Sequence, residues 1–123
     1  MTEGPTIIKR KDLYYLFYTA NDFRNPDYAV GYAVSSSPYG PWKKYTGNPI
    51  LSRKNIGTNG TGHGDFDLNK RRNLVYVFHT HYSPTKATPR KTAIIKASFS
   101  KGKVNGEDQV SVDPTTFYFP QVE

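Results

Sequence analysis

Hydrophobic and aromatic residues occur along this chain in short runs, and turn-forming or charged residues interrupt them at close intervals. Short runs of aromatic and β-branched residues between turn residues are typical of β-strands. The pattern therefore predicts an all-β chain of about seven or eight strands. The predicted strands cover residues 6–10, 13–19, 28–36, 74–82 and 92–99, with shorter ones from Trp42 onward and at 117–119.

The polar and apolar positions within these runs also predict how the strands are connected and covered. Lys11 and Asp12 separate the first two runs by the length of a tight hairpin turn. Residues 13–19 are apolar on both faces, as expected for a sheet that is covered on both sides. Small residues alternate in the run 28–36, which predicts close packing against that face. Residues 46–62 are weakly patterned and predict a long connection.

Composition narrows the possible classes of protein. The chain has 123 residues, enough for one ordinary domain, with 36% hydrophobic residues, ten tyrosines and seven phenylalanines. It has no cysteine, so disulfides and thiolate metal sites are excluded. No stretch approaches the roughly 20 apolar residues of a membrane-spanning helix. We expect a soluble chain without a membrane partner, and its localisation stays open.

The chain carries a formal charge of +7, from 17 Lys and Arg against 10 Asp and Glu. Basic proteins gain affinity for nucleic acids by releasing phosphate counterions. However, the densest basic runs, Lys9 to Lys11 and Lys70 to Arg72, each lie between predicted strands, where solvated hairpin turns belong. We therefore expect no nucleic-acid partner, and a nucleic-acid-binding β domain is the least favoured alternative.

Motifs in a fixed order connect the chain to a known family. They are EGP at 3–5, YAVGYAVSSSPYGPW at 28–42, GTGHGDF at 60–66 and LVYVFHTHY at 74–82. Their order resembles the C-terminal portion of glycoside hydrolase family 43, the five-bladed β-propellers that include β-xylosidases, α-L-arabinofuranosidases and arabinanases. The resemblance implies a single partial propeller domain over residues 1–123. It would contain about two four-stranded antiparallel blades, approximately at 3–50 and 60–119.

The resemblance implies that Glu3 is the general acid of an inverting glycosidase. The parent activity would be hydrolysis of O-glycosidic bonds in xylosides or arabinosides of plant polysaccharides. Inverting glycosidases pair a general acid with a carboxylate base that activates water. In the family, the base and a second aspartate come from earlier blades, and only two residues precede Glu3 here. We therefore expect a fragment that carries the acid half of the site and has little or no activity alone. The parent would be a secreted or periplasmic enzyme.

Two further residues match substrate-binding positions of the family. His63 lies between glycines, where neighbouring side chains leave an imidazole accessible. By resemblance it is the active-centre histidine, which in several members helps to hold a calcium ion largely through waters. Arg90 would match an arginine that reaches the substrate or the acid, where its planar fork suits carboxylate or hydroxyl contacts. The resemblance implies no required cofactor.

Two alternatives stay open on the residues alone. His79 and His81 are two apart on a predicted strand and would share a face, which together with His63 suggests a three-histidine zinc site. The other alternative is a carbohydrate-binding β module without catalysis, which holds sugar through exposed aromatic residues and His63. In either glycan-binding reading the partner is an oligosaccharide or polysaccharide of the xylan or arabinan type. Open blade edges also predict self-association.

Overall fold

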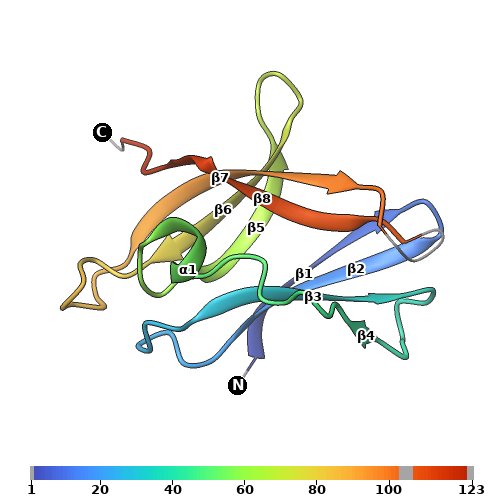
Figure 1. Ribbon diagram of the computed structural model, residues 1–123, viewed down its shortest axis with the longest axis horizontal. Coiled ribbons are helices and arrows are strands. Elements are labelled where there is room, and N and C mark those ends of the chain that lie inside the picture. Colours follow the sequence, from blue (N-terminus) through green and yellow to red (C-terminus); the bar gives the residue numbers. More distant parts are fainter. Residues whose placement is uncertain (1, 103–106, 122–123) are drawn as a thin grey trace.

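The computed structural model describes residues 2–102 and 107–121 and contains two four-stranded antiparallel sheets (Figure 1). The first sheet has the order β1 (Thr2–Arg10), β2 (Leu13–Ala20), β3 (Ala29–Ser35) and β4 (Lys43–Lys44). The second has the order β5 (Gly62–Leu68), β6 (Leu74–Thr80), β7 (Lys91–Ser100) and β8 (Gln109–Tyr118). The predicted all-β fold with two four-stranded antiparallel units is confirmed.

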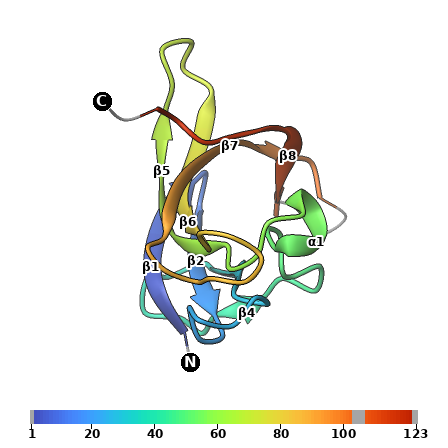
Figure 2. The ribbon, with the colours of Figure 1, turned by 90° about the vertical axis from the view of Figure 1, so that its left-hand side faces the viewer.

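Each sheet is a meander in which every strand pairs with its neighbours in sequence. The first strands of the two sheets, β1 and β5, contact each other (Figure 2). The predicted solvated turns are confirmed for Lys11 and for residues 70–72, where Lys11 and Arg72 adopt positive φ and are exposed. Arg10 differs, because it is half-buried at the end of β1 and pairs with Asp108 at 2.9 Å.

The hydrophobic core lies between the two sheets. Phe17 from β2 and Tyr76 from β6 are both buried, and Phe66 from β5 bridges them with ring-centroid distances of 4.5 and 4.7 Å. Burial of one large apolar side chain contributes roughly 1.5–3 kcal/mol. The aromatic residues that the sequence places in strand interiors therefore join the sheets rather than form an exposed platform.

Buried tyrosine hydroxyls add polar links between the sheets. The Tyr15 hydroxyl accepts a hydrogen bond from the backbone N–H of Asp108 at 2.9 Å and donates to the Asp108 carbonyl at 3.0 Å. The Tyr32 hydroxyl accepts from the Val110 N–H at 3.2 Å. Burial raises the pKa of Tyr32 to about 12, so this side chain stays neutral at physiological pH. These bonds hold the segment before β8 and the start of β8 against the first sheet.

The connection at 46–62 is more structured than its composition predicts. Leu51 is fully buried and pairs with Val30, whose N–H donates to the Leu51 carbonyl at 2.9 Å. The helix α1 (Arg53–Ile56) follows, and Ser52 caps it by accepting from the Lys54 N–H. A helix of four residues is too short to produce a helical periodicity in the sequence. The sequence pattern did not predict α1 because the helix is this short.

Two strands were missed or shortened by the sequence pattern. β5 begins inside the predicted connection, at Gly62, and β8 extends over Gln109–Tyr118 where only a strand at 117–119 was predicted. Pro114 interrupts the apolar alternation of β8, but β8 is an edge strand, where proline is tolerated. Phe119 lies beyond the end of β8.

The close packing predicted for one face of the third run is confirmed. A Cβ on Gly31 would lie 2.8 Å from the side-chain carbon Cγ of Asn48. The Asn48 amide accepts from the Tyr32 N–H at 3.0 Å and donates to the Tyr32 carbonyl at 2.8 Å. The connection after β4 is therefore held against β3 by a side chain that uses the space the glycine leaves.

Candidate active site

Glu3 lies near the beginning of β1, where it pairs with Thr19 of β2. Its carboxylate oxygen Oε1 accepts a hydrogen bond from the Tyr28 hydroxyl. Burial, followed by this hydrogen bond to Glu3, raises the pKa of Tyr28, so Tyr28 remains a donor over the physiological range. A neutral donor thus fixes the carboxylate that the sequence analysis named as the acid.

His63 lies at the beginning of β5, next to the strand that carries Glu3. Its backbone N–H donates to the buried Thr19 hydroxyl at 2.9 Å, and its side chain is exposed. His63 has φ +54°, which is uncommon for a residue with a side chain and costs of order 1–3 kcal/mol. The pairing of β5 with β6 shifts register between Gly62 and Asp65. His63 therefore lies in an irregular strand start and not in an isolated Gly-His-Gly turn.

Two glycines beside His63 permit the close packing that positions it. A Cβ on Gly62 would lie 2.2 Å from Thr19 Cγ2, so only glycine lets β5 approach β2 this closely. Gly60 has φ +70°, and a Cβ there would lie 1.9 Å from His81 Cδ2. Packing alone therefore requires glycine at positions 60 and 62 of the GTGHG motif, independently of any ligand.

Arg90 precedes β7 and is half-buried at the same end of the sheets. Its guanidinium carbon lies 5.0 Å from the centroid of the Phe23 ring, a cation–π distance. Burial is the main cause of the raised pKa of Tyr28 and of the lowered pKa of His79. The positive charge of Arg90 opposes the first shift and adds to the second. Arg90 therefore belongs to the same electrostatic environment as the Tyr28–Glu3 pair.

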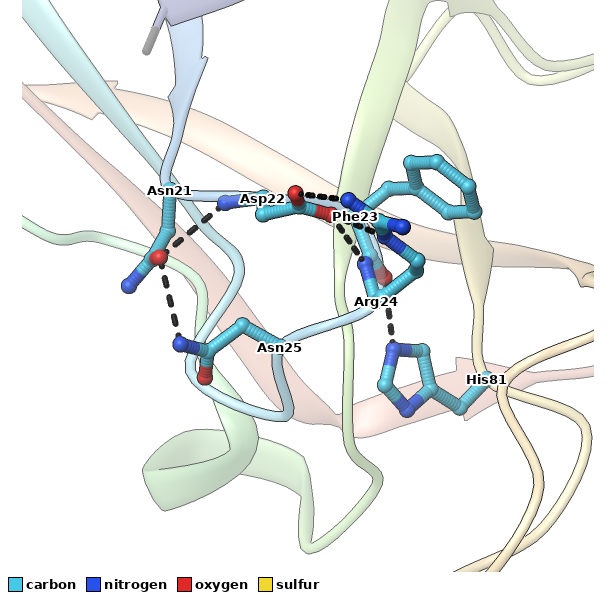
Figure 3. Close-up of polar contacts among 6 residues, drawn as sticks. All are labelled: Asn21, Asp22, Phe23, Arg24, Asn25 and His81. Atoms are coloured by element: carbon cyan, nitrogen blue, oxygen red, sulfur yellow. Dashed lines mark hydrogen bonds and ion pairs between the residues drawn. The ribbon is translucent and has the colours of Figure 1, made fainter.

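The loop between β2 and β3, which carries Phe23, is internally bonded (Figure 3). Asp22 forms a bidentate pair with Arg24 at 3.0 and 2.8 Å, and Arg24 holds the pKa of Asp22 at about 2. The carbonyl of Phe23 accepts from His81 Nε2 at 2.7 Å, which ties the loop to the second sheet. The loop that carries Phe23 is thus held by its own Asp22–Arg24 pair and by the bond from His81.

The three predicted site residues share one end of the sheets but not one cavity. His63 lines a cavity of about 380 Å³ together with Asp65, His79 and Thr92. Glu3 lines a second cavity of about 400 Å³ on the first sheet, beside Leu16, Tyr18 and Trp42. Pro5 of β1 lines both. The structure therefore places Glu3 and His63 on either side of the start of β1.

Comparison with known proteins identifies the family. The model of the glycosyl hydrolases family 43 matches residues 1–104. This chain belongs to glycosyl hydrolase family 43. The motifs that suggested the family from the sequence are confirmed, and the two sheets are a partial propeller of the family 43 type.

Solved family 43 structures superpose closely on this chain. A thermostable family-43 glycoside hydrolase is 39% identical, with a TM-score of 0.82 over 98% of this chain and 38% of its own. An endo-1,4-β-xylanase from Bacteroides thetaiotaomicron VPI-5482 is 38% identical, with a TM-score of 0.80 over 92% of this chain and 38% of its own. A β-D-galactofuranosidase, xynD, from Aspergillus niger is 27% identical over 100 residues, 80% of this chain and 29% of that protein. The chain thus spans well under half the length of these relatives.

His79, which the sequence suggested only as a possible zinc ligand, lies beside His63 in this region. Its ring lies 6.4 Å from the His63 ring, across the cavity that both line. Among the described residues, no group hydrogen-bonds its buried Nδ1 atom. Burial, then the charge of Arg90, then His63, lowers the pKa of His79 below its ordinary value. A histidine inside an aromatic strand carries no sequence signal for such a site, because its environment comes from β5 and from the segment before β7.

We expect His79 to make the stability of the fold sensitive to acid. Because its pKa is lower in the folded state than in the unfolded chain, the unfolded state binds the proton more readily. The contribution of His79 to the free energy of unfolding should therefore be constant above about pH 6.5 and fall as the pH drops below it. Urea denaturation at pH 7.5 and pH 5.5 measures this loss, and His79→Asn should reduce it. An equal loss in wild type and variant would contradict the assignment.

The histidines do not form the zinc site considered above. Strand pairing ends at Thr80, and His81 beyond it bonds the Phe23 carbonyl, while His79 lines the cavity with His63. His79 and His81 therefore have different partners. Within residues 2–102 and 107–121, no three His, Asp or Glu side chains are grouped to hold a metal ion.

The residues around the His63 cavity also decide whether this cavity can coordinate calcium directly. Calcium takes six to eight oxygen ligands. Asp65 lines the His63 cavity, but its Oδ1 already accepts from the Thr6 hydroxyl and from the Phe66 N–H, each at 2.8 Å. The described residues do not fit direct coordination of calcium.

No helix in the described part of the chain has the length and apolar character needed to cross a membrane.

Proposed function

We propose that this chain supplies the general-acid half of an inverting glycosidase site that cleaves xylosides or arabinosides of plant polysaccharides. The observation that carries the proposal is the carboxylate of Glu3, bonded by the Tyr28 hydroxyl at the start of β1. That position lies at the same end of the sheets as His63 and Arg90. In this proposal Glu3 protonates the leaving oxygen, and His63 and Arg90 contact sugar hydroxyls.

The second half of the mechanism needs a carboxylate that activates water on the other side of the sugar. Asp65 is a poor candidate, because the Thr6 hydroxyl and the Phe66 N–H already bond one of its oxygens. Asp67 likewise accepts from the Leu68 N–H at 2.7 Å. We therefore assign the base to a segment carrying the aspartates that precede EGP in the family. Calcium held near His63 through waters remains part of this proposal.

The relatives favour a xylosidic linkage. The endo-1,4-β-xylanase from B. thetaiotaomicron is 38% identical to this chain, whereas the A. niger β-D-galactofuranosidase is 27% identical. Identity of this order supports a shared acid and shared sheet geometry, while the sugar is selected by a few pocket contacts. Chromogenic xylosides are thus the first substrates to use, and arabinofuranosides the second.

Hydrolysis by the chain, alone and mixed with a separately expressed upstream segment that carries the missing aspartates, tests the proposal. We expect activity in the mixture and little or none from either part. Measurable hydrolysis by the pure 123-residue chain would contradict the half-site assignment. No activity in the mixture, with both parts folded, would leave the non-catalytic carbohydrate-binding module as the better interpretation.

We also propose that the isolated chain self-associates. The cavity on the first sheet is lined by Leu16, Tyr18 and Trp42, and short strand β4 leaves that sheet with an open edge. Unpaired edges and open apolar faces favour association with a second copy. Light scattering should give a mass above 13.9 kDa that falls on dilution or on Trp42→Ser. A monomer at all working concentrations would count against the proposal, with Tyr39→Ser as the control for an exposed aromatic residue elsewhere.

A further inference from the structure

A groove of about 230 Å³ lies at the outer rim of the same end of the sheets. It is built from the turn after α1, the segment that follows β6, the start of β7 and the residue after β8. Glu3, His63 and Arg90 do not line it. The groove is therefore separate from the candidate active site, although it opens at the same end of the sheets. Its lining includes Asn59, His81, Tyr82, Ser83, Lys91 and Phe119.

Two aromatic rings in the groove are exposed. Tyr82 is 46% exposed and Phe119 is 40% exposed, whereas Phe17, Tyr76 and Phe78 of the strands are buried in the core. The Phe119 ring packs edge-on against Phe117, with centroids 5.0 Å apart, and Phe117 in turn packs against the core. Phe119 is thus supported by the core, and both rings are open to solvent, as in an aromatic ligand surface.

A cation lies between these rings. The Lys91 ammonium is 5.3 Å from the Tyr82 centroid and 5.1 Å from the Phe119 centroid. Lys86 adds a second ammonium 5.7 Å from the Tyr82 centroid. In the described part of the chain, no carboxylate lies within 4.0 Å of either ammonium, and none lines the groove. The groove therefore offers positive charge that no described acidic side chain balances.

The walls of the groove are fixed by hydrogen bonds. The His81 N–H donates to the Asn59 carbonyl at 2.9 Å, and His81 Nε2 donates to the Phe23 carbonyl at 2.7 Å. The loop after Tyr82 is closed by a bond from the Ser83 N–H to the Lys86 carbonyl at 3.0 Å. A preformed wall lowers the ordering cost of binding.

We propose that this groove binds a uronic acid residue of an acidic glycan. The apolar face of the sugar ring would lie on Tyr82 and Phe119, and its carboxylate would accept hydrogen bonds from Lys91 and Lys86. Charge-assisted hydrogen bonds to a carboxylate are among the stronger polar contacts, and the aromatic surface distinguishes a sugar acid from a simple anion. The volume lies below the roughly 300–1,000 Å³ of pockets for drug-sized ligands, which fits one sugar residue.

The location suggests how the groove serves the proposed hydrolysis, and this link rests on the proposed function. Arg90 and Lys91 are consecutive, and His81 in the groove wall bonds the carbonyl of Phe23, the residue beneath Arg90. A polysaccharide chain that enters the active site would thus carry its acidic substituents past the rim. The groove would select xylan decorated with uronic acid over undecorated xylan.

Binding to the full chain tests the proposal without hydrolysis. Backbone amide NMR shifts would be followed during titration with a xylotriose that bears a glucuronic acid branch, with neutral xylotriose, and with inorganic phosphate. We expect shifts around Tyr82, Lys91 and Phe119 with the acidic sugar, and binding that weakens as salt rises. Lys91→Gln should weaken this binding about 10-fold or more, because it removes a charged partner. Equal binding of the neutral sugar or of phosphate would overturn the proposal, as would no binding.

Matched variants locate the site. Lys70→Gln removes an exposed lysine outside the groove and Tyr39→Ala an exposed tyrosine outside it, so both should bind the acidic sugar as the wild type does. Glu3→Gln should also leave binding unchanged. Loss of binding in Glu3→Gln, with no effect of Lys91→Gln, would place the ligand at the active site and refute the groove. Hydrolysis is measured separately, so binding here without hydrolysis in the mixture would refute only the proposed function.

Discussion

Replacing Glu3 by glutamine is expected to lower kcat of the reconstituted enzyme on an aryl xyloside with a poor leaving group by about 10²–10⁴-fold. The amide cannot donate the proton that the leaving oxygen needs, while its size and the contact with Tyr28 are nearly preserved. Substrate binding should change little, because Glu3→Gln retains the shape of the side chain. Steady-state rates of the mixture, with wild-type chain and with variant, measure the effect.

The leaving group provides the control for this result. A dinitrophenyl leaving group departs as a stable anion and needs no protonation, so Glu3→Gln should retain most of the rate on that substrate. A similar loss on both substrates would show that Glu3 positions the sugar and does not act as an acid. Tyr28→Phe should cause a smaller loss, since it removes the hydrogen bond but leaves the carboxyl group.

Gly60→Ala is expected to destabilise the fold by about 3–5 kcal/mol, among the largest effects of one added methyl group. The new Cβ would lie 1.9 Å from His81 Cδ2, and His81 is held by bonds to Phe23 and Asn59. The φ of +70° adds the cost of a left-handed conformation, about 1–2 kcal/mol. Urea denaturation followed by tyrosine fluorescence measures the loss.

Gly57→Ala separates the two causes. Gly57 has φ +73°, close to that of Gly60, but nothing lies within 4 Å of an added Cβ. The variant should therefore lose only the cost of the left-handed conformation, about 1–2 kcal/mol. If Gly60→Ala were no less stable than Gly57→Ala, the contact with His81 would not be the reason for glycine at that position. A Gly60→Ala chain that fails to fold, beside a folded Gly57→Ala, would agree with the prediction.

A strand could be predicted from the sequence wherever its own residues alternate or are rich in strand-forming types. The runs that became β2, β3, β6 and β7 are rich in aromatic and branched residues, so the local pattern sufficed. β5 and β8 could not be predicted in this way. Glycines interrupt β5 and Pro114 interrupts β8, and each forms because a neighbouring strand pairs with it.

The residues of the candidate site also fall into those that the sequence predicted and those that it did not. Glu3, His63 and Arg90 were found from motifs that resemble the family, and their roles remain predictions. Tyr28 was not found, and His79 was considered only as a zinc ligand, because the significance of both comes from contacts across the fold. Tyr28 bonds a residue 25 positions away in sequence, and His79 lies on a different strand from His63.

The sequence by itself determined the all-β class, the hairpins and the family. These depend on the local alternation of polar and apolar residues and on short sequence motifs. Only the tertiary structure decided that Glu3 is bonded by Tyr28, that His79 and His81 face different surroundings, and that Lys91 lies between two exposed rings. The physical reason is that a side chain's hydrogen bonds, burial and neighbouring charges come from strands that are distant in sequence. Packing of one sheet on another brings them together, and the sequence pattern of a single strand does not contain that packing.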